Sequence, residues 1–435
     1  MRFVSTRGQA SAVPISTAIR DGVAPDGGLY LPEAVPRADL AALTPDMPLA
    51  DFAARMLAPF FAGDALADAL PGICADAFDF PVPLVTPNSA NGLRVLELFH
   101  GPTGAFKDFG ARFLMGCFDR SSDPNVPLTV LVATSGDTGG AVGCAAEGRR
   151  GLRAVILYPR DRVSAFQERQ LTCWSEPVHA LEVDGDFDDC QRLVKAAFAD
   201  ARLSARHGLT SANSINIARL LPQMVYLARA AMRVAGETGI APGLIIPTGN
   251  LGHGFAAVYA RAMGFPIGPI LAVTNANRTL HDWHADGRYA PRASLATIAN
   301  AMDVGTPSNF ERLAHMPPAD GTITVELVDD DAIRARIVAD DRAGYLWCPH
   351  SATAAEAYAR LDQNARNARS WITAATAHSY KFADIVEPLI GREIAPPPAL
   401  AGITGRAVHK RSIAATSGAL VAALEESAYA TIGNG

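Results

Sequence analysis

Side-chain amines are scarce in this sequence of 435 residues, which has only four lysines: Lys107, Lys195, Lys381 and Lys410. Lys107 stands between Phe106 and Phe109, after a short apolar run and at the expected start of a helix. An amine among apolar side chains has a lowered pKa and is a better nucleophile near neutral pH, which suits Schiff-base chemistry. An ordinary lysine at a helix start is the alternative. We expect the other three lysines to have no chemical role.

Two glycine-rich loops follow other apolar runs. In TSGDTGG (134–140), the backbone and the hydroxyls of Ser135 and Thr138 can approach an anion, and a capped helix with a tight turn is the alternative. In TGNLGHG (248–254), the glycines can hold a phosphate without a lysine, or the loop is a plain strand-to-helix turn. Its glycines do not follow the dinucleotide order G-x-G-x-x-G. The chain also has no P-loop motif, which excludes a P-loop NTPase by motif.

A fourth segment, SANSINIARLLPQ (211–223), brings polar side chains to an expected helix start. Ser214, Asn216 and Arg219 fall close together there, and Arg219 can hold a phosphate or carboxylate with two parallel hydrogen bonds. A surface arginine is the alternative. The histidines of HDWH (281–284) have a spacing that suits a metal, but no third ligand is obvious, so we expect no metal site.

The elements that must position these loops read as alternating strands and helices. Short apolar runs predict strands at 94–99, 129–134, 153–158, 244–248 and 269–275. Because helical patterns separate them, we expect an α/β fold with a mostly parallel sheet covered by helices on both faces. Ligands bind at the carboxyl ends of strands in such sheets, which is where the loops fall. Residues 40–70 and the tail from 418 to 432 are expected to be helical.

The composition limits the classes of protein and partner. The formal net charge of −6 argues against nucleic acid as a partner, because phosphate backbones require a basic surface. No apolar run approaches the ~20 residues of a membrane span, and the first residues have no apolar core of a signal peptide. The six cysteines form no C-x-x-C pair and favour reduced thiols. We therefore expect a cytoplasmic protein without a membrane partner.

The loops occur within longer motifs that resemble the threonine synthase family. HGPTGAFKDFGARF, ATSGDTGGA, NSINIARLLPQ, PTGNLGHGFAA and TAHSYKF appear in that order, with STRG, APDGGLYLPE and AMDVGTPSNFERL elsewhere. The resemblance extends from residue 3 to about residue 385 and is to the longer form of the enzyme. It implies an N-terminal domain at 1–95, a first α/β lobe at 96–235 and a second at 236–435.

The resemblance implies the tryptophan-synthase-β-like fold, which is fold type II of pyridoxal-phosphate enzymes, with two open twisted α/β lobes. It implies pyridoxal 5′-phosphate as cofactor and a carbon–oxygen lyase that acts on phosphates. The expected reaction converts O-phospho-L-homoserine and water to L-threonine and phosphate, the last step of threonine biosynthesis, in a monomer or homodimer. The alternatives are a phospho-lyase that releases a keto acid from a similar substrate, and a non-catalytic metabolite-binding protein.

The resemblance also implies roles for individual residues. Lys107 would form the Schiff base with the cofactor and act as the catalytic residue. The cofactor phosphate would lie on Gly249, Asn250, Leu251, Gly252 and His253. The carboxylate of the substrate and the ring hydroxyl of the cofactor would be flanked by Ser135, Asp137 and Thr138. The substrate phosphate would be held by Ser214, Asn216 and Arg219, and the pyridine nitrogen would face Thr376. His253 replaces an asparagine that is usual in the family, and PHSATA (349–354) and TAHSYKF (376–382) also depart from its pattern.

Overall fold

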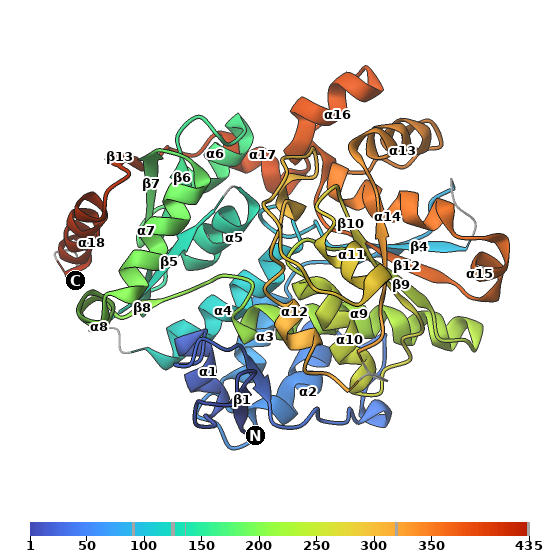
Figure 1. Cartoon of the computed structure of the whole chain (residues 1–435), viewed down its shortest axis with the longest axis horizontal. Helices are drawn as coiled ribbons and strands as arrows, with labels where there is room; N and C mark the ends of the chain where they lie inside the picture. The colour runs from blue at the N-terminus through green and yellow to red at the C-terminus, as the bar shows by residue number, and fades with distance from the viewer. Residues whose placement is uncertain (89–91, 123–126, 135, 318–320, 433–435) are drawn as a thin grey trace.

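The computed structural model describes residues 1–432, apart from 89–91, 123–126, 135 and 318–320. Two α/β lobes stand side by side, each built on its own sheet, and the N-terminal segment lies at the bottom of the view (Figure 1). The expected α/β class is therefore confirmed. No helix in the described ranges is both long and apolar enough to cross a membrane.

The lobe on the right of Figure 1 contains a six-stranded sheet. Its strands in spatial order are β11 (Thr324–Leu327), β10 (Ile270–Thr274), β9 (Gly243–Pro247), β12 (Trp371–Ala375), β4 (Leu93–Glu97) and β3 (Leu84–Val85). All neighbours pair in parallel except β3, which runs antiparallel to β4. The strand β12 at the middle of this sheet was not predicted from the sequence.

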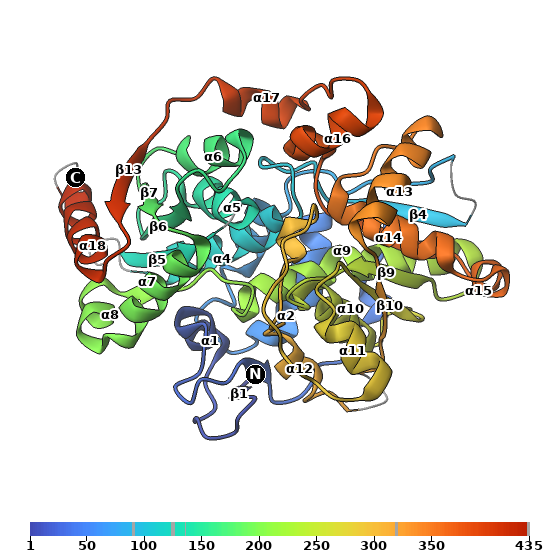
Figure 2. The same ribbon diagram turned by 45° about the horizontal axis from the view of Figure 1, so that its top comes forward.

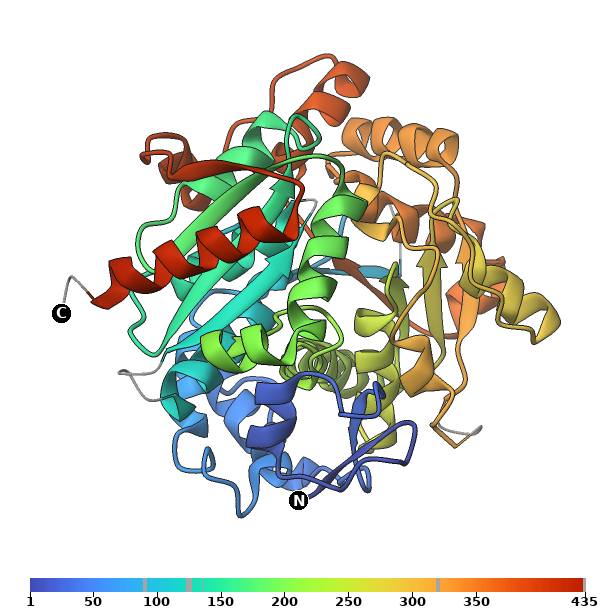
Figure 3. The same cartoon turned by 60° about the vertical axis from the view of Figure 1, so that its left-hand side comes forward.

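The other lobe contains a five-stranded parallel sheet. Its strands in spatial order are β13 (Lys410–Ala414), β7 (Val178–Asp184), β6 (Leu152–Pro159), β5 (Leu128–Ala133) and β8 (Leu209–Thr210). The edge strand β13 comes from the C-terminal segment, which crosses from the other lobe (Figure 2). After β13 the chain ends in α18 (Ser417–Ile432), which lies on the outside of this lobe (Figure 3).

Helices pack on the sheets and join them. Those before the second glycine loop are α4 (Lys107–Ser121), α5 (Asp137–Ala146), α6 (Ala165–Thr172), α7 (Phe187–Ala199), α8 (Ala201–His207) and α9 (Ile217–Thr238). Those after it are α10 (Gly252–Ala262), α11 (Thr279–Asp286), α12 (Phe310–Leu313), α13 (Asp330–Arg342), α14 (Pro349–Arg360), α15 (Gln363–Ala368), α16 (Ala383–Ile390) and α17 (Pro398–Thr404). Short 3₁₀ turns are η1 (Leu40–Ala42), η2 (Asn300–Met302) and η3 (Ser379–Phe382).

The central strands of each sheet are buried on both faces, as their continuous apolar runs require. On β9, Leu244 and Ile246 belong to a core shared with α9 and α10, whereas Ile245 belongs to a separate core with α13 and α14. On β5, Val130 and Leu131 likewise point into different cores. The alternation follows from the two-residue period of a strand, and it holds the strand ends in fixed positions.

The N-terminal segment packs beneath the lobes. Its elements are β1 (Phe3–Ser5), α1 (Ile15–Asp21), β2 (Tyr30–Pro32), α2 (Leu49–Phe61) and α3 (Leu70–Ala77). The helix α2 contacts α9, and α3 contacts α4, so this segment supports two of the helices whose first turns face the space between the lobes. The expected helices within residues 40–70 are present as α2 and the start of α3.

The two sheets do not follow the linear division of the sequence. The strand β4 precedes residue 107 but pairs with β12 of the later segment, and β13 joins the sheet of the earlier segment. The expected boundaries of the lobes, 96–235 and 236–435, therefore stay a prediction. Each sheet contains strands from outside the matching segment, β3 and β4 in one sheet and β13 in the other. These pairings tie the lobes together through backbone hydrogen bonds.

Candidate active site

A cavity of about 170 Å³ lies at the carboxyl ends of strands from both sheets. The strands β9, β12 and β4 are neighbours in one parallel sheet, so the loops that follow them meet at the same edge. The loop after β5 of the other sheet completes the cavity. The predicted residues that line it are Lys107, Asp137, Thr138, Ser214, Arg219, Gly249, Asn250, Leu251, Gly252, His253 and Thr376.

Lys107 is the first residue of α4, and hydrogen bonds hold its loop on two sides. The hydroxyl and backbone N–H of Thr103 donate to the two carboxylate oxygens of Asp108, at 2.6 and 2.9 Å. The backbone N–H of Phe106 donates to the carbonyl oxygen of Thr376 at 2.8 Å. Burial raises the pKa of Asp108 to about 6, although the bonds from Thr103 oppose this. These contacts fix the start of α4 and hence the amine.

The environment of Lys107 shifts its amine toward the neutral form. Burial lowers its pKa from 10.5 to about 8, and the cations of Arg219 and Lys381 lower it too, whereas the carboxylate of Asp137 raises it. Near neutral pH such an amine is deprotonated far more often than an exposed lysine. This agrees with the lowered pKa expected from the flanking phenylalanines, and it suits both nucleophilic addition and proton transfer.

Asp137 is the first residue of α5 and is buried. Burial alone would raise the pKa of this carboxyl, but the ammonium groups of Lys381 and Lys107 lower it to about 2. The amine Nζ of Lys381 lies 3.1 Å from Asp137 Oδ1, and the side chain of Lys381 is fully buried. A second lysine, Lys381, therefore lies beside the cavity, whereas the sequence predicted a chemical role for Lys107 alone.

The glycine loop after β9 presents its backbone to the cavity. A Cβ at Gly249 would lie 2.8 Å from Cα of Met302, so only glycine fits there. Leu251 has a φ of 61°, a left-handed conformation that costs a side-chain-bearing residue of order 1–2 kcal/mol. It turns the chain into α10, whose first residue is Gly252. Free N–H groups at a helix start bind anions, which suits a phosphate.

His253, in the first turn of α10, is neutral and rigidly held. Burial lowers its pKa to about 3. Its ring stacks on Phe106, with centroids 4.9 Å apart and planes inclined by 17°. Its Nε2 lies 3.1 Å from the hydroxyl of Tyr226 on α9. His253 therefore packs the residue next to Lys107 against the glycine loop, which explains how a histidine is accommodated in place of an asparagine.

The first turn of α9 contributes a buried guanidinium. Arg219 donates from Nη1 to the carbonyl oxygen of Ala212 at 2.5 Å. A Cβ at Gly110 would lie 2.9 Å from its Nε, so glycine makes room for this side chain. Burial lowers the pKa of Arg219 to about 10, which still leaves it cationic at neutral pH. Ser214 lies nearby and accepts a hydrogen bond from the amide of Asn250 at 2.6 Å.

His350 and Thr376 also line the cavity. The backbone N–H of Ala301 donates to His350 Nε2 at 3.0 Å, so the proton of the neutral imidazole lies on Nδ1. Burial lowers the pKa of His350 to about 4, although Asp137 opposes the shift. The hydroxyl of Thr376 lies 3.3 Å from that of Ser351. Both residues therefore offer neutral polar groups to the cavity.

The cavity contains polar groups that the described protein atoms leave unsatisfied. Among the described residues, buried atoms without a hydrogen-bond partner include Arg219 Nε, Gln223 Oε1, His253 Nδ1 and His350 Nδ1, all on residues of this lining. Unpaired buried polar atoms are rare because each costs about 1–3 kcal/mol. Their concentration here, beside the glycine loop and Lys107, fits a polar, phosphate-bearing ligand such as pyridoxal phosphate with its substrate.

Two of the predicted residues need separate comment. Asn216 does not line the cavity, because its amide donates to Ile19 O at 2.8 Å and its oxygen caps α9 at Ala218 N–H. Ser135 lies outside the described residues. Nothing in the sequence patterns predicted Asp108, Gln223 or Lys381, and the loop-like position of His350 left a structural role and a substrate contact equally open. His350 and Lys381 lie in PHSATA and TAHSYKF, so these departing motifs were the available signal.

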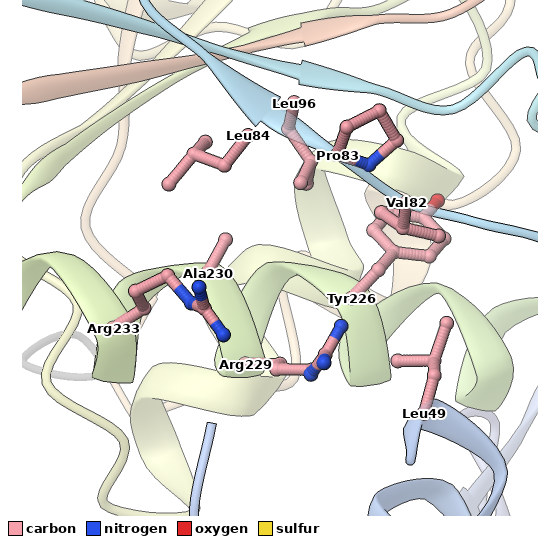
Figure 4. A pocket seen from close by; sticks show the side chains of 9 residues that line it. All are labelled: Leu49, Val82, Pro83, Leu84, Leu96, Tyr226, Arg229, Ala230 and Arg233. Atoms are coloured by element: carbon pink, nitrogen blue, oxygen red, sulfur yellow. The ribbon is translucent and has the colours of Figure 1, made fainter. Parts of the chain in front are cut away.

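A second cavity, of about 190 Å³, lies on the far part of α9 (Figure 4). Arg229 and Arg233 face apolar side chains of β3, β4 and the segment before β3 (Figure 4). Both guanidinium groups donate to the carbonyl oxygen of Pro45, and Arg233 also pairs with Asp46 at 2.9 Å. The arginines of this cavity thus attach the loop before α2 to α9.

Family models match almost the whole chain. Residues 83–376 match a model described as a pyridoxal-phosphate dependent enzyme. Residues 2–78 match the threonine synthase N terminus, and residues 351–424 match the threonine synthase C-terminal model. The matched segments include the glycine loops, the lysine loop and Lys381.

The chain matches threonine synthases over most of their length. The chain is 36% identical to threonine synthase of Escherichia coli and 34% identical to that of Haemophilus influenzae, covering 92% of this chain and 94% of each relative. It also superposes on a crystal structure of PLP-bound threonine synthase from Brucella melitensis with a TM-score of 0.90, at 33% identity, covering 98% of this chain and 99% of that one. The chain belongs to the threonine synthase family of pyridoxal-phosphate-dependent enzymes.

Proposed function

We propose that this cavity converts O-phospho-L-homoserine and water to L-threonine and phosphate with pyridoxal 5′-phosphate as cofactor. The observation that carries the proposal is the convergence of Lys107, the glycine loop and Arg219 in one cavity. It combines a reactive amine, a backbone anion site and a buried cation, which match a cofactor phosphate and a substrate phosphate.

We assign the cofactor phosphate to the backbone of Gly249, Asn250, Leu251, Gly252 and His253. Lys107 is the residue that bonds covalently to the cofactor, and Thr376 is the hydroxyl for its pyridine nitrogen. A hydroxyl there, instead of a carboxylate, leaves that nitrogen unprotonated. Once bound, the cofactor supplies an electron sink for charge on the carbons of the substrate.

Lys107 moves the protons in this proposal. Its neutral Nζ takes the proton at Cα of the substrate and gives it up before it takes one at Cβ, because one amine at the start of α4 reaches adjacent carbons. The proton from Cβ ends on Cγ, where the bond to phosphate breaks, and a proton returns to Cα when threonine forms. The pKa of about 8 allows Nζ both to accept and to return a proton near neutral pH. Its position depends on the hydrogen bonds between Thr103 and Asp108.

Arg219 and Ser214 hold the substrate phosphate and stabilise it as it leaves. The hydrogen bond from Nη1 of Arg219 to Ala212 orients the guanidinium group, so little side-chain entropy is lost on binding. Its Nε has no partner among the described residues and is available to the phosphate. We assign the carboxylate of the substrate to Thr138 and Ser135, with Asp137 beside them for the ring hydroxyl of the cofactor. Asn216 is left out of the substrate site, because its side chain is committed to capping α9 and to Ile19.

Product analysis tests the proposed reaction against its alternatives. The purified full chain with cofactor is incubated with O-phospho-L-homoserine, and threonine, 2-oxobutanoate and phosphate are measured. Equal amounts of threonine and phosphate are expected. A predominance of 2-oxobutanoate with ammonia would show a phospho-lyase instead. An unchanged substrate, together with no cofactor trapped on Lys107 by borohydride, would indicate a non-catalytic binding protein.

We also propose the cellular setting. The protein acts in the cytoplasm on a small molecule, without a nucleic-acid or membrane partner, as a monomer or homodimer. The net charge of −6 and six free thiols support this proposal. Size-exclusion chromatography with light scattering measures the oligomeric state.

A further inference from the structure

Lys381 is a second buried amine beside the catalytic cavity. It lies in η3, after β12, and its Nζ has three oxygen neighbours. It donates to the carbonyl oxygen of Thr103 at 2.7 Å and to Oε1 of Gln170 at 2.6 Å, and it lies 3.1 Å from Oδ1 of Asp137. Asp137 is the only carboxylate among these neighbours, so this ammonium group and this carboxylate form a buried ion pair.

Asp137 of this pair lines the same cavity as Lys107. The carboxylate of Asp137 attracts the ammonium form of Lys107, and the cation of Lys381 opposes that form. With Lys381 present, Asp137 already has a counterion. Without it, Lys107 would be the nearest ammonium group to a buried carboxylate, and buried charges require partners.

We propose that Lys381 is a positioning residue that holds Asp137 as its own ion-pair partner and thereby keeps the amine of Lys107 easier to deprotonate and more reactive. The inference rests on the proposed function only in taking Lys107 as the reactive amine. Lys381 does not line the cavity, so it acts on the chemistry through Asp137. No role was predicted for it from the sequence.

None of the other charged and titratable groups described around Lys107 replaces Lys381 as the counterion of Asp137. Arg219 on α9 also opposes the ammonium form, but it belongs to the substrate phosphate in the proposed site. His350 on α14 and His253 on α10 are neutral, since burial lowers their pKa to about 4 and about 3. Asp108 on α4 is bound by Thr103. Asp137 is thus the carboxylate whose pairing decides the state of Lys107.

Lys410 provides a matched control. It too contacts two side-chain oxygens, Glu168 Oε1 at 2.6 Å and Glu182 Oε1 at 2.7 Å. It lies on β13, is partly exposed and is absent from the neighbours that affect Lys107. A substitution at Lys410 removes a paired lysine without touching Asp137.

The test measures Lys107 directly in the full-length chain freed of cofactor. Competitive acetylation with acetic anhydride at a series of pH values, followed by mass spectrometry of the Lys107 peptide, gives the pKa and reactivity of this amine. The variants are Lys381→Gln, which removes the charge but can still donate hydrogen bonds, and Lys410→Gln. Far-UV circular dichroism and thermal melting verify folding.

For Lys381→Gln we expect the pKa of Lys107 to rise by about one unit, with acetylation near neutral pH about tenfold slower. In the holoenzyme the acidic limb of the pH dependence of kcat should move in the same direction, because kcat reports the complex with substrate, in which the amine of Lys107 is free. Lys410→Gln should change neither quantity. An unchanged pKa of Lys107 in folded Lys381→Gln, or an equal shift in Lys410→Gln, would overturn the inference.

The double variant Asp137→Asn/Lys381→Gln covers the case in which Lys381→Gln does not fold. It removes both charges of the pair, so it should fold and return the pKa of Lys107 to near the wild-type value. A pKa that stays raised would show that Lys381 does not act through Asp137. Failure of the proposed function itself is visible separately, because borohydride would then trap no cofactor on Lys107 in the wild-type chain.

Discussion

Helix α9 borders two cavities of similar size that differ in what their polar groups do. Arg219 and Gln223 near its start face the catalytic cavity of about 170 Å³. Arg229 and Arg233 further along face the second cavity of about 190 Å³ (Figure 4). In the first cavity Arg219 Nε and Gln223 Oε1 have no partner among the described residues. In the second, both guanidinium groups donate to the loop before α2.

The comparison shows that volume alone does not mark a binding site. A buried polar atom without a partner costs about 1–3 kcal/mol, so a fold keeps such atoms together only where something else completes them. In the second cavity, the guanidinium groups of Arg229 and Arg233 bind the N-terminal segment. The catalytic cavity has kept donors and acceptors available, and it has a lysine of lowered pKa. Substitutions in the two cavities should therefore have different effects.

The largest expected effect is that of Lys107→Ala. Because Lys107 is the covalent attachment and the proton carrier in the proposed site, turnover of O-phospho-L-homoserine should fall by about a thousandfold or more. Threonine formation and cofactor trapping by borohydride are the measurements. Turnover close to that of the wild-type protein would contradict the role given to Lys107.

The next effect is that of Arg219→Gln in the same cavity. Losing a charged hydrogen-bond donor to phosphate costs about 1.5–3 kcal/mol, which corresponds to a loss of kcat/KM of about tenfold to a hundredfold. Steady-state kinetics with O-phospho-L-homoserine measure it, and inorganic phosphate should also inhibit the variant less. A variant with unaltered kcat/KM would remove Arg219 from the substrate site.

The pH dependence of cofactor attachment should reflect the pKa of Lys107. The neutral amine reacts, so below a pKa of about 8 the rate should rise about tenfold per pH unit and level off above it. Stopped-flow absorbance after mixing the cofactor with cofactor-free protein follows this rate. A rate that continued to rise toward pH 10 would mean an ordinary, exposed lysine.

The smallest effect on activity is expected in the second cavity. Arg229→Gln removes donors to the carbonyl oxygens of Pro45 and Met47, so the free energy of unfolding should fall by about 1–2 kcal/mol. The value of kcat/KM should stay within about twofold of wild type, because the catalytic donors are unaffected. Denaturant unfolding and steady-state kinetics measure both. A large loss of activity in a folded variant would show that the two cavities are coupled.

Much of the fold could be predicted from local patterns. The apolar runs that became β5, β6, β9 and β10 are continuous because both faces of each strand are buried. The strand β12 was missed although it lies at the middle of a sheet, since its run WITAA is short and follows a polar segment. The strand β13 was missed because most of its residues are exposed, so it has no apolar run.

The sequence by itself determined which segments carry reactive groups: a lysine between phenylalanines, two glycine loops and an arginine at a helix start. These features depend on neighbours within a few residues. Only the tertiary structure decided the charge of these groups and the partners that they bind. It commits Asn216 to Ile19 rather than to the cavity. It also places Lys381 against Thr103, 278 residues away along the chain, and against Asp137. Burial and charge interactions add over all neighbours in space, and no local pattern contains that sum.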